Sequence, residues 1–204
     1  MDENIINFKS FLSKKFPRLI DIIKSFKECS LNDNDNEYLV ESKVTTINFD
    51  KLTEWYINKQ GVKSADSMSL SNDSVYLIEF KSGDLTTNEK KFQKLTSNVI
   101  GKINDSDKTL NKLYNEAKID KINQVFCLVV DTKKMGISAL TTSLISRSLI
   151  DNKNDKEIKI LEQLKPNLNA GVLNPDHFSN IEIWYSQILD THLSKNGITD
   201  FCIE

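Results

Sequence analysis

An almost entirely apolar run, QVFCLVVD at positions 124–131, constrains the fold more than any other segment of this 204-residue chain. The run is rich in β-branched residues, which is typical of a central strand that is buried on both faces. Such a strand needs other strands beside it and helices against its sheet. We therefore expect an α/β or α+β domain built around this run.

The segments before the run predict the rest of a core. Their order is helix, strand, turn, strand and long helix, at 49–58, 62–70, 71–73, 75–80 and about 86–118. Asn48 can cap the first helix. The long helix carries apolar residues at helical spacing, and the polar stretch NDSD at 104–107 predicts a break near Gly101. The two strands are spaced as in a β-hairpin.

Both ends of the chain are predicted to add helices to this core. Residues 4–27 carry apolar residues at helical spacing, and Pro17 suits the first turn of a second helix. Near the other end, the segments ISALTTSLISRSLI and NIEIWYSQILDTHL are interpreted as helices on the sheet or as a small lobe. We expect one domain over 1–204, with a core at about 48–131, a helical N-terminal extension at 1–47 and a helical C-terminal part at 135–204.

Composition limits the functions that are open to the chain. Its fractions of hydrophobic residues (39%) and charged residues (27%) are those of an ordinary soluble protein. No apolar run is long enough to span a bilayer, and the acidic, polar start MDENIINFKS is unlike a signal peptide, so we expect a cytoplasmic protein without membrane contact. The net charge is −2, so any binding of nucleic acid would depend on a local patch or on bound cations.

Several common kinds of site find no support in the sequence. The cysteines Cys29, Cys127 and Cys202 are far apart and form no CxxC pair, which argues against a structural zinc site. His177 and His192 are isolated, and we expect both at the surface. There is no Gly-X-Ser-X-Gly elbow and no Walker-type phosphate loop, so the motifs of serine hydrolases and ATPases are missing.

The segment SADSMSLSNDSVYLIEFKSG, at 64–83, brings acidic and basic residues together in the predicted hairpin. Side chains alternate along a strand, so Glu79 and Lys81 point to one side, whereas Phe80 and its apolar neighbours point to the other. The hairpin returns Asp66 alongside the end of the second strand. Two converging carboxylates repel each other unless a cation lies between them, and oxygen ligands of this kind suit magnesium.

These residues resemble the motif of the PD-(D/E)XK nuclease superfamily, which includes restriction enzymes and Holliday junction resolvases. In that family an aspartate begins one strand and an (Asp/Glu)-X-Lys sequence ends the next, as Asp66 and the string IEFKSG do here. The resemblance implies that Asp66, Glu79 and the backbone carbonyl of Phe80 hold Mg²⁺, for which Mn²⁺ can substitute. It implies that Lys81 acts on the attacking water or on the scissile phosphate. The family's proline before the first acid is replaced by Ala65.

The resemblance implies a metal-dependent nuclease that hydrolyses phosphodiester bonds of nucleic acid, with DNA as the expected substrate. It also implies a restriction-endonuclease-like mixed β-sheet flanked by helices, with the extra terminal helices described above, and it allows a homodimer or a partner protein. The alternative is a catalytically weak or inactive module with the same fold. Such a module would bind nucleic acid or help to assemble a phage-defence or phage-encoded complex.

A second tier of candidates comes from the same resemblance. Many family members add a glutamate from a preceding helix, for which Glu54 is the first candidate and Glu41 the alternative. Gln93 corresponds to a glutamine that some members place on the helix after the lysine. The favoured interpretation of Glu54 and Gln93 is nevertheless that they are solvated helix residues. The long helix also carries lysines that either bind phosphate or form an ordinary exposed face: Lys90, Lys91, Lys94, Lys102, Lys108 and Lys112.

Overall fold

A computed structural model gives the fold, and it describes residues 1–32, 36–59, 62–82, 89–131, 166–168, 170–171 and 180–202. Its main helices are α1 (Glu3–Lys15), α2 (Phe26–Cys29), α3 (Phe49–Ile57), α4 (Glu89–Ala117) and α7 (Leu189–Lys195). Two 3-10 helices are η1 (Leu19–Ile22) and η3 (Ser186–Ile188). The strands are β1 (Ile23–Ser25), β2 (Leu31–Asn32), β3 (Glu37–Tyr38), β4 (Thr45–Asn48), β5 (Ser67–Leu70), β6 (Ser74–Lys81), β7 (Asn123–Val130) and β8 (Asn180–Tyr185).

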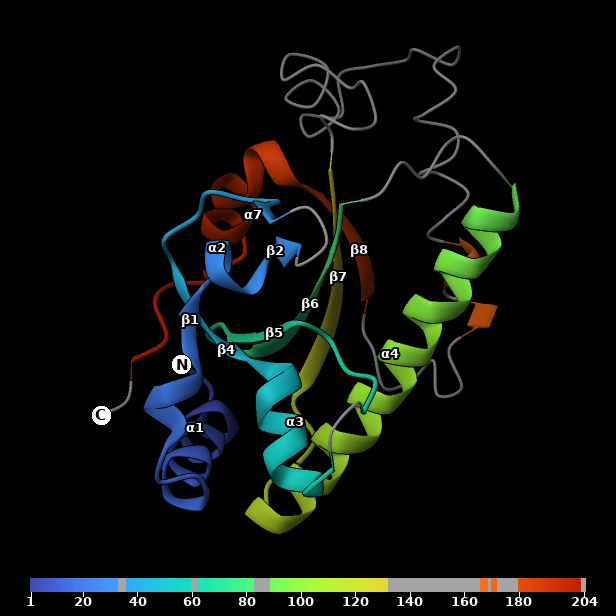
Figure 1. Ribbon diagram of the computed structural model, residues 1–204. Helices are drawn as coiled ribbons and strands as arrows, with labels where there is room; N and C mark the ends of the chain where they lie inside the picture. Colours follow the sequence, from blue (N-terminus) through green and yellow to red (C-terminus); the bar gives the residue numbers. More distant parts are fainter. Residues whose placement is uncertain are drawn as a thin grey trace.

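Six of these strands form one mixed sheet, in the order β1-β4-β5-β6-β7-β8 (Figure 1). The pairs from β1 to β6 are antiparallel, whereas β7 runs parallel to both β6 and β8. Strands β2 and β3 form a separate small antiparallel pair. The structure therefore confirms the expected mixed sheet with flanking helices, and the α+β class, at this level of detail.

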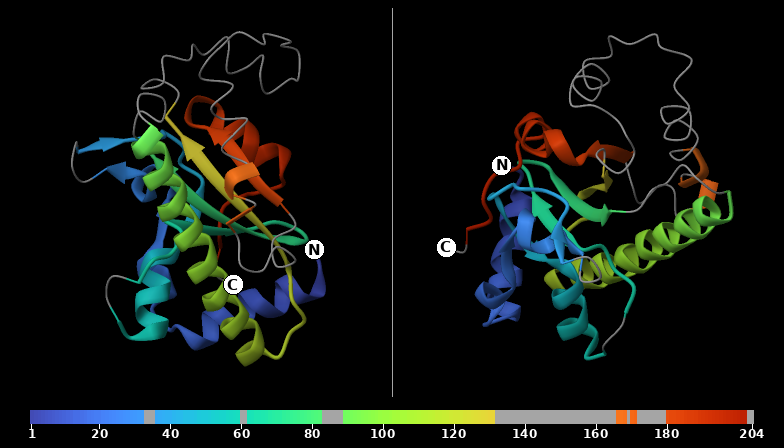
Figure 2. Two further views of the ribbon diagram at one scale, coloured as in Figure 1. Left: turned by 90° about the vertical axis from the view of Figure 1, so that its right-hand side faces the viewer. Right: turned by 45° about the horizontal axis from the view of Figure 1, so that its top comes forward.

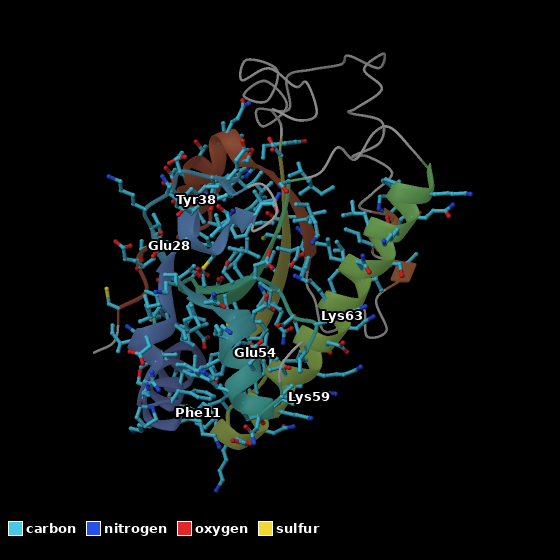
Figure 3. The ribbon with its side chains drawn as sticks, viewed as in Figure 1. Phe11, Glu28, Tyr38, Glu54, Lys59 and Lys63 are labelled. Carbon is cyan, nitrogen blue, oxygen red and sulfur yellow. The ribbon has the colours of Figure 1, made fainter. Side chains whose placement is uncertain are left out.

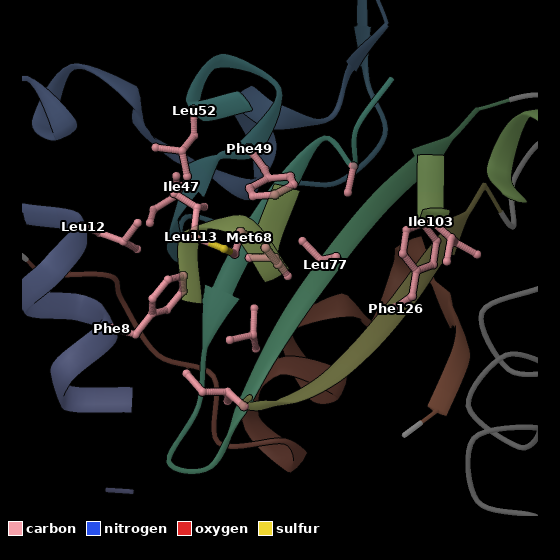
Figure 4. Close-up of a cluster of buried hydrophobic side chains, with 14 of the residues drawn as sticks. Phe8, Leu12, Ile47, Phe49, Leu52, Met68, Leu77, Ile103, Leu113 and Phe126 are labelled. Atoms are coloured by element: carbon pink, nitrogen blue, oxygen red, sulfur yellow. The ribbon is translucent and has the colours of Figure 1, made fainter. Parts of the chain in front are cut away.

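Helices lie on both faces of the sheet. Helices α1, α3 and α4 lie on one face, and α7 lies on the other (Figures 1 and 2). The face toward α1, α3 and α4 carries the larger apolar cluster, part of which is shown in Figure 4. Residues from both ends of the chain, including Phe8 and Phe201, belong to that cluster together with Leu77 of β6.

Strands β6 and β7 separate the two apolar clusters in the manner that side-chain alternation predicts. Val75 and Leu77 belong to the larger cluster, while Tyr76, Ile78 and Phe80 belong to the cluster on the α7 side. Strand β7 is buried at every position after its first residue and contributes alternate residues to both clusters. The prediction that QVFCLVVD is a central strand buried on both faces is confirmed.

The sequence predicted a helical N-terminal extension, but the structure shows strands there as well as helices. The predicted second helix after Pro17 is instead the short η1, followed by β1, which pairs in register with β4. Ser25 ends this strand because it begins α2 with a capping box, in which its hydroxyl and the Glu28 carboxylate bind each other's backbone N–H. Two strands of the main sheet therefore precede the expected core.

The C-terminal part also differs from its prediction. Residues 180–185 form β8 rather than helix, because the apolar edge of β7 requires a partner strand. Helix α7 follows, and His192 on it is stacked on the buried Trp184, with ring centroids 5.3 Å apart. His192 is therefore half-buried rather than a fully exposed surface residue, whereas His177 and the segment ISALTTSLISRSLI lie outside the described residues.

Helix α4 is continuous, which corrects the predicted break near Gly101. The polar residues at 104–107 find partners within the fold. Ser106 is fully buried and binds the backbone N–H of Ala65, and Asp107 accepts a hydrogen bond from Asn111 one turn later. Polar residues with such partners need not end a helix. Among the described residues, no helix has the length and apolar character needed to cross a membrane.

Candidate functional site

Asp66 and Glu79 lie at the fork where β5 and β6 separate. The last residues in register at this end are Ser67 and Ile78, so each acid is one step beyond a paired residue. The Asp66 carboxylate accepts a hydrogen bond from the backbone N–H of Phe80, with Oδ2 2.7 Å from the nitrogen. The side chain of the first acid is thus held against the end of the second strand, as the hairpin predicts.

Two backbone contacts fix the segment that carries Asp66. Its carbonyl accepts a hydrogen bond from the N–H of Phe49 at 3.1 Å, which ties it to the start of α3. The N–H of the preceding Ala65 donates to Oγ of Ser106 on α4 at 2.9 Å. Proline has no N–H to donate, so the alanine makes a contact that a proline at this position could not make.

Glu79 is fully buried, with both carboxylate oxygens directed at ammonium groups. Oε1 forms an ion pair with Nζ of Lys81, two residues along the same strand. This contact agrees with the prediction that Glu79 and Lys81 point to one side of β6. Oε2 accepts a hydrogen bond from Nζ of Lys102 at 2.7 Å.

Lys102, on α4, joins the two acids. Its Nζ lies 2.9 Å from Oδ1 of Asp66 and 2.7 Å from Oε2 of Glu79, so one ammonium group contacts both carboxylates. The sequence-based prediction placed a cation between these acids, but it considered Lys102 only as one of the lysines that could bind phosphate. The sequence pattern does indicate that Lys102 faces the sheet, because it lies three residues after Val99 and next to Ile103, at the border of the apolar stripe of the helix.

Burial and charge act against each other at this cluster. Burial, together with the nearby Asp66 charge, raises the pKa of Glu79 to about 7, although Lys81 and Lys102 oppose the rise. Burial lowers the pKa of Lys102, but the two carboxylates outweigh it and the pKa lies above its usual value. Lys102 is therefore a firmly held cation, while Glu79 titrates close to neutral pH.

Asp50 is a third acid beside this cluster, and the sequence interpretation missed it as a site residue. It lies in the first turn of α3, and its carboxylate accepts a short hydrogen bond from Ser64. Burial raises its pKa, the Ser64 hydrogen bond and the charge of Lys102 oppose this rise, and the charge of Asp66 adds to it. The helix start had been recognised, but its orientation toward the hairpin depends on tertiary packing.

The short elements α2 and β2 lie next to the fork. Cys29, at the end of α2, is close enough to Asp66 that the carboxylate adds to the effect of burial, and together they raise the thiol pKa to about 12. Asn32 of β2 donates a hydrogen bond to Ser82, directly after β6, at 2.9 Å. The acidic pair is therefore bordered by α2 and β2 as well as by α3 and α4.

The second-tier candidates are placed differently from the acidic pair. Glu54 lies one turn after Asp50 on α3, where its carboxylate pairs with Lys51 at 2.8 Å and retains a side-chain exposure of 25%. Glu41 pairs with Lys27 on the surface, and its side chain is 78% exposed. Its role as an additional glutamate of the site stays a prediction. Gln93 is exposed on α4, nine residues before Lys102, or about 13 Å along the helix axis.

The residues at the fork suit a magnesium ion in kind but offer few ligands. Among the described residues, no group of three or more His, Cys, Asp or Glu side chains could hold a metal ion. Magnesium commonly uses one or two carboxylates and keeps several waters, so Asp66 and Glu79 could suffice if Lys102 withdrew. Oε1 of Glu79 is buried and has an ion-pair partner but no hydrogen bond, which leaves it able to accept a further ligand. The role expected for the Phe80 carbonyl stays a prediction.

The cluster combines two buried or partly buried carboxylates, two ammonium groups and a nearby third acid. Side chains of this kind can bind a cation, hold an anionic group such as phosphate, or transfer a proton near neutral pH. Comparisons with known proteins do not narrow these choices: no protein-family model, curated protein or solved structure matches the chain.

Proposed function

We propose that this chain is a divalent-metal-dependent nuclease of the PD-(D/E)XK type that hydrolyses phosphodiester bonds, with DNA as its substrate and a restriction-endonuclease-like fold. The observation that carries the proposal is the convergence of Asp66, Glu79 and Lys81 at the fork between β5 and β6. The two acids share one cation, at 2.9 and 2.7 Å, and Lys81 faces the remaining oxygen of Glu79.

Each of the three residues has a role that follows from its position. Asp66 and Glu79 would hold Mg²⁺, which lowers the pKa of a bound water and stabilises charge on the phosphate. Lys81 is 26% exposed at its side chain, so its ammonium can contact Glu79 from one side and a substrate from the other. There it would orient the attacking water or stabilise the scissile phosphate electrostatically.

Positive charge near the fork supports an anionic substrate despite the net charge of −2. Lys81 and Lys102 lie at the acidic pair itself. Lys63 lies along α4, since a Cβ at Gly101 would be 3.5 Å from its Cδ and 3.7 Å from its Nζ; Figure 3 shows Lys63 beside this helix. Such a local group of lysines can bind phosphate even where the whole chain is slightly acidic.

The test is cleavage of single-stranded, double-stranded and branched DNA, and of RNA, in Mg²⁺ or Mn²⁺. We expect DNA cleavage that a chelator stops, and a loss of roughly 10²-fold to 10⁴-fold in Glu79→Ala and Lys81→Ala. Glu116→Gln is the matched control, because it removes a surface carboxylate that lies 14 residues after Lys102 on α4, about 21 Å along the helix axis, and it should cleave as the wild type does. Cleavage that survives in Glu79→Ala would contradict the proposal.

Two observations favour the second candidate, an inactive or weak module that binds nucleic acid or assembles with a partner. Lys102 already contacts both acids, and the described residues offer no group of three metal-binding side chains. Calorimetric titration separates the two functions. If no heat of Mg²⁺ or Mn²⁺ binding is measured and none of the nucleic acids is cleaved, the module is favoured over the nuclease.

A further inference from the structure

We propose that Lys102 is an internal counter-ion that occupies the metal position between Asp66 and Glu79, and that a divalent cation binds only by displacing it. The inference rests on the proposed function, because it concerns the same pair of acids. It goes further by assigning α4 a residue that controls when the site is loaded.

The geometry leaves no room for both cations between the acids. Nζ of Lys102 lies within hydrogen-bonding distance of Oδ1 of Asp66 and of Oε2 of Glu79. A metal that used these oxygens would lie at about 2.1 Å from each of them, and thus in the space that the ammonium fills. Binding of the metal through these two oxygens therefore requires the lysine to leave.

The charges point to the same conclusion. When both acids are ionised, their two formal negative charges equal the two positive charges of Lys81 and Lys102, so the cluster is balanced without a metal. When Glu79 is protonated, the cluster already carries excess positive charge. A divalent ion added beside both lysines would leave excess positive charge in a buried place, which is costly. Departure of Lys102 removes part of that excess.

The side chain of Lys102 has a route out of the cluster. It retains 22% exposure, whereas Glu79 has none, so the flexible stem of the lysine can carry its ammonium into solvent. An ammonium released at this edge would stay beside the fork, where a phosphate of the substrate could contact it. The lysine would then first leave the site to the metal and afterwards contact a phosphate of the substrate.

Mn²⁺ affinity, measured by calorimetry on the whole chain, tests the exchange. Lys102→Met keeps the length of the side chain and removes its charge, and Lys108→Met on the exposed face of α4 is the matched control. If Lys102 vacates the site in about a tenth of molecules or fewer, its removal should tighten Mn²⁺ binding by about tenfold or more. The control should bind Mn²⁺ as the wild type does.

The outcomes separate this inference from the proposed function. Equal affinities in wild type and Lys102→Met, with binding that Glu79→Ala abolishes, would overturn the exchange and leave the nuclease proposal standing. No Mn²⁺ binding by either protein would overturn both. Mn²⁺ binding by Lys102→Met but not by the wild type would support the exchange, because it would show that Lys102 keeps the metal out of the wild-type site.

A second measurement keeps the inference testable if Lys102→Met does not fold. Reductive methylation of the wild-type chain, read by peptide mass spectrometry, reports how accessible each lysine amine is. We expect slow labelling of Lys102 without metal and several-fold faster labelling in Mg²⁺, with Lys108 unchanged as an internal reference. Constant labelling of Lys102 under conditions where Mg²⁺ binds would overturn the exchange.

Discussion

The two faces of the main sheet bury polar groups in opposite ways. On the face toward α4, Glu79 is fully buried between two ammonium groups, and the positive charges of these lysines offset the negative charge of the acids. On the face toward α7, Trp184 is 1% exposed; its indole N–H donates to Glu182 at 2.6 Å, and its ring stacks on His192. The polar groups on the first face, the charged face, are held by ion pairs, and those on the second, the aromatic face, by contacts with aromatic rings.

The difference teaches which face is free to change. Removing atoms from a packed aromatic cluster lowers the stability of the fold, whereas a balanced set of charges can exchange one cation for another. A site that must admit a metal and a substrate therefore belongs on the charged face. Both faces have an apolar cluster around these polar groups, and it is this packing that supplies stability.

The largest expected effect concerns the aromatic face. Trp184→Ala should lower the free energy of unfolding by about 4 kcal/mol, because it leaves a cavity beside Tyr76 and His192. The measurement is urea denaturation, with Trp55→Ala as the control. Trp55 is 37% exposed, so its removal should cost far less. Equal losses in the two variants would mean that the face toward α7 contributes no special stability.

The charged face should make the metal-free protein less stable as pH rises. The pKa of Glu79 is raised from 4.5 to about 7, so the folded state holds a proton that the unfolded state releases within this window. Stability is therefore full below 4.5 and falls by about 3 kcal/mol as pH passes through 7. Denaturation in chelator at several pH values checks this. Glu79→Gln should remove the slope, and an unchanged slope would assign it to another group.

The contact between the hairpin and α4 should have a smaller effect. Ala65→Pro removes the N–H that binds Ser106 and leaves a buried hydroxyl without that donor, at a cost of about 2 kcal/mol. Ser106→Ala removes the other partner. In a double-mutant cycle the two changes should cost less together than the sum of their separate costs. Additive losses would show that the contact does not couple the hairpin to α4.

The smallest expected effect is a pH dependence of the opposite sign on the aromatic face. Burial lowers the pKa of His192 from 6.5 to about 4, with Glu182 opposing and Lys195 adding to the shift. The neutral ring is favoured in the fold, so stability is full above 6.5 and falls as pH drops toward 4. Because solvent still reaches the ring, we expect a loss of only about 1 kcal/mol. His192→Phe keeps a ring against Trp184 and should abolish this acid-side loss in thermal denaturation.

The parts of the fold that the sequence predicts correctly are those set by local patterns. The hairpin and QVFCLVVD follow from apolar runs and turn residues, and β5, β6 and β7 lie within one to five residues of the predicted bounds. Strands β1 and β8 were interpreted as helix because their few apolar residues fit either periodicity. They become strands only through partners at β4 and β7.

The candidate site divides in the same way. Alternation along β6 and the return of the hairpin suffice to bring Asp66, Glu79 and Lys81 together. Lys102 and Asp50 come from helices, and their contribution depends on how α4 and α3 are rotated against the sheet. That rotation is fixed by the packing of apolar side chains such as Ile103 and Phe49, which pairwise spacing in the sequence does not encode.

The carboxylate of Asp66 also completes the hydrogen bonding at the end of the hairpin. It accepts a hydrogen bond from the backbone N–H of Phe80, which lies beyond the last paired residues of β5 and β6. An alanine at this position would release that amide and loosen the strand end on which Glu79 and Lys81 are carried. Lost activity in such a variant would then mix missing chemistry with a frayed scaffold. Asp66→Asn retains an acceptor oxygen for that amide and is therefore the better choice at the first acid.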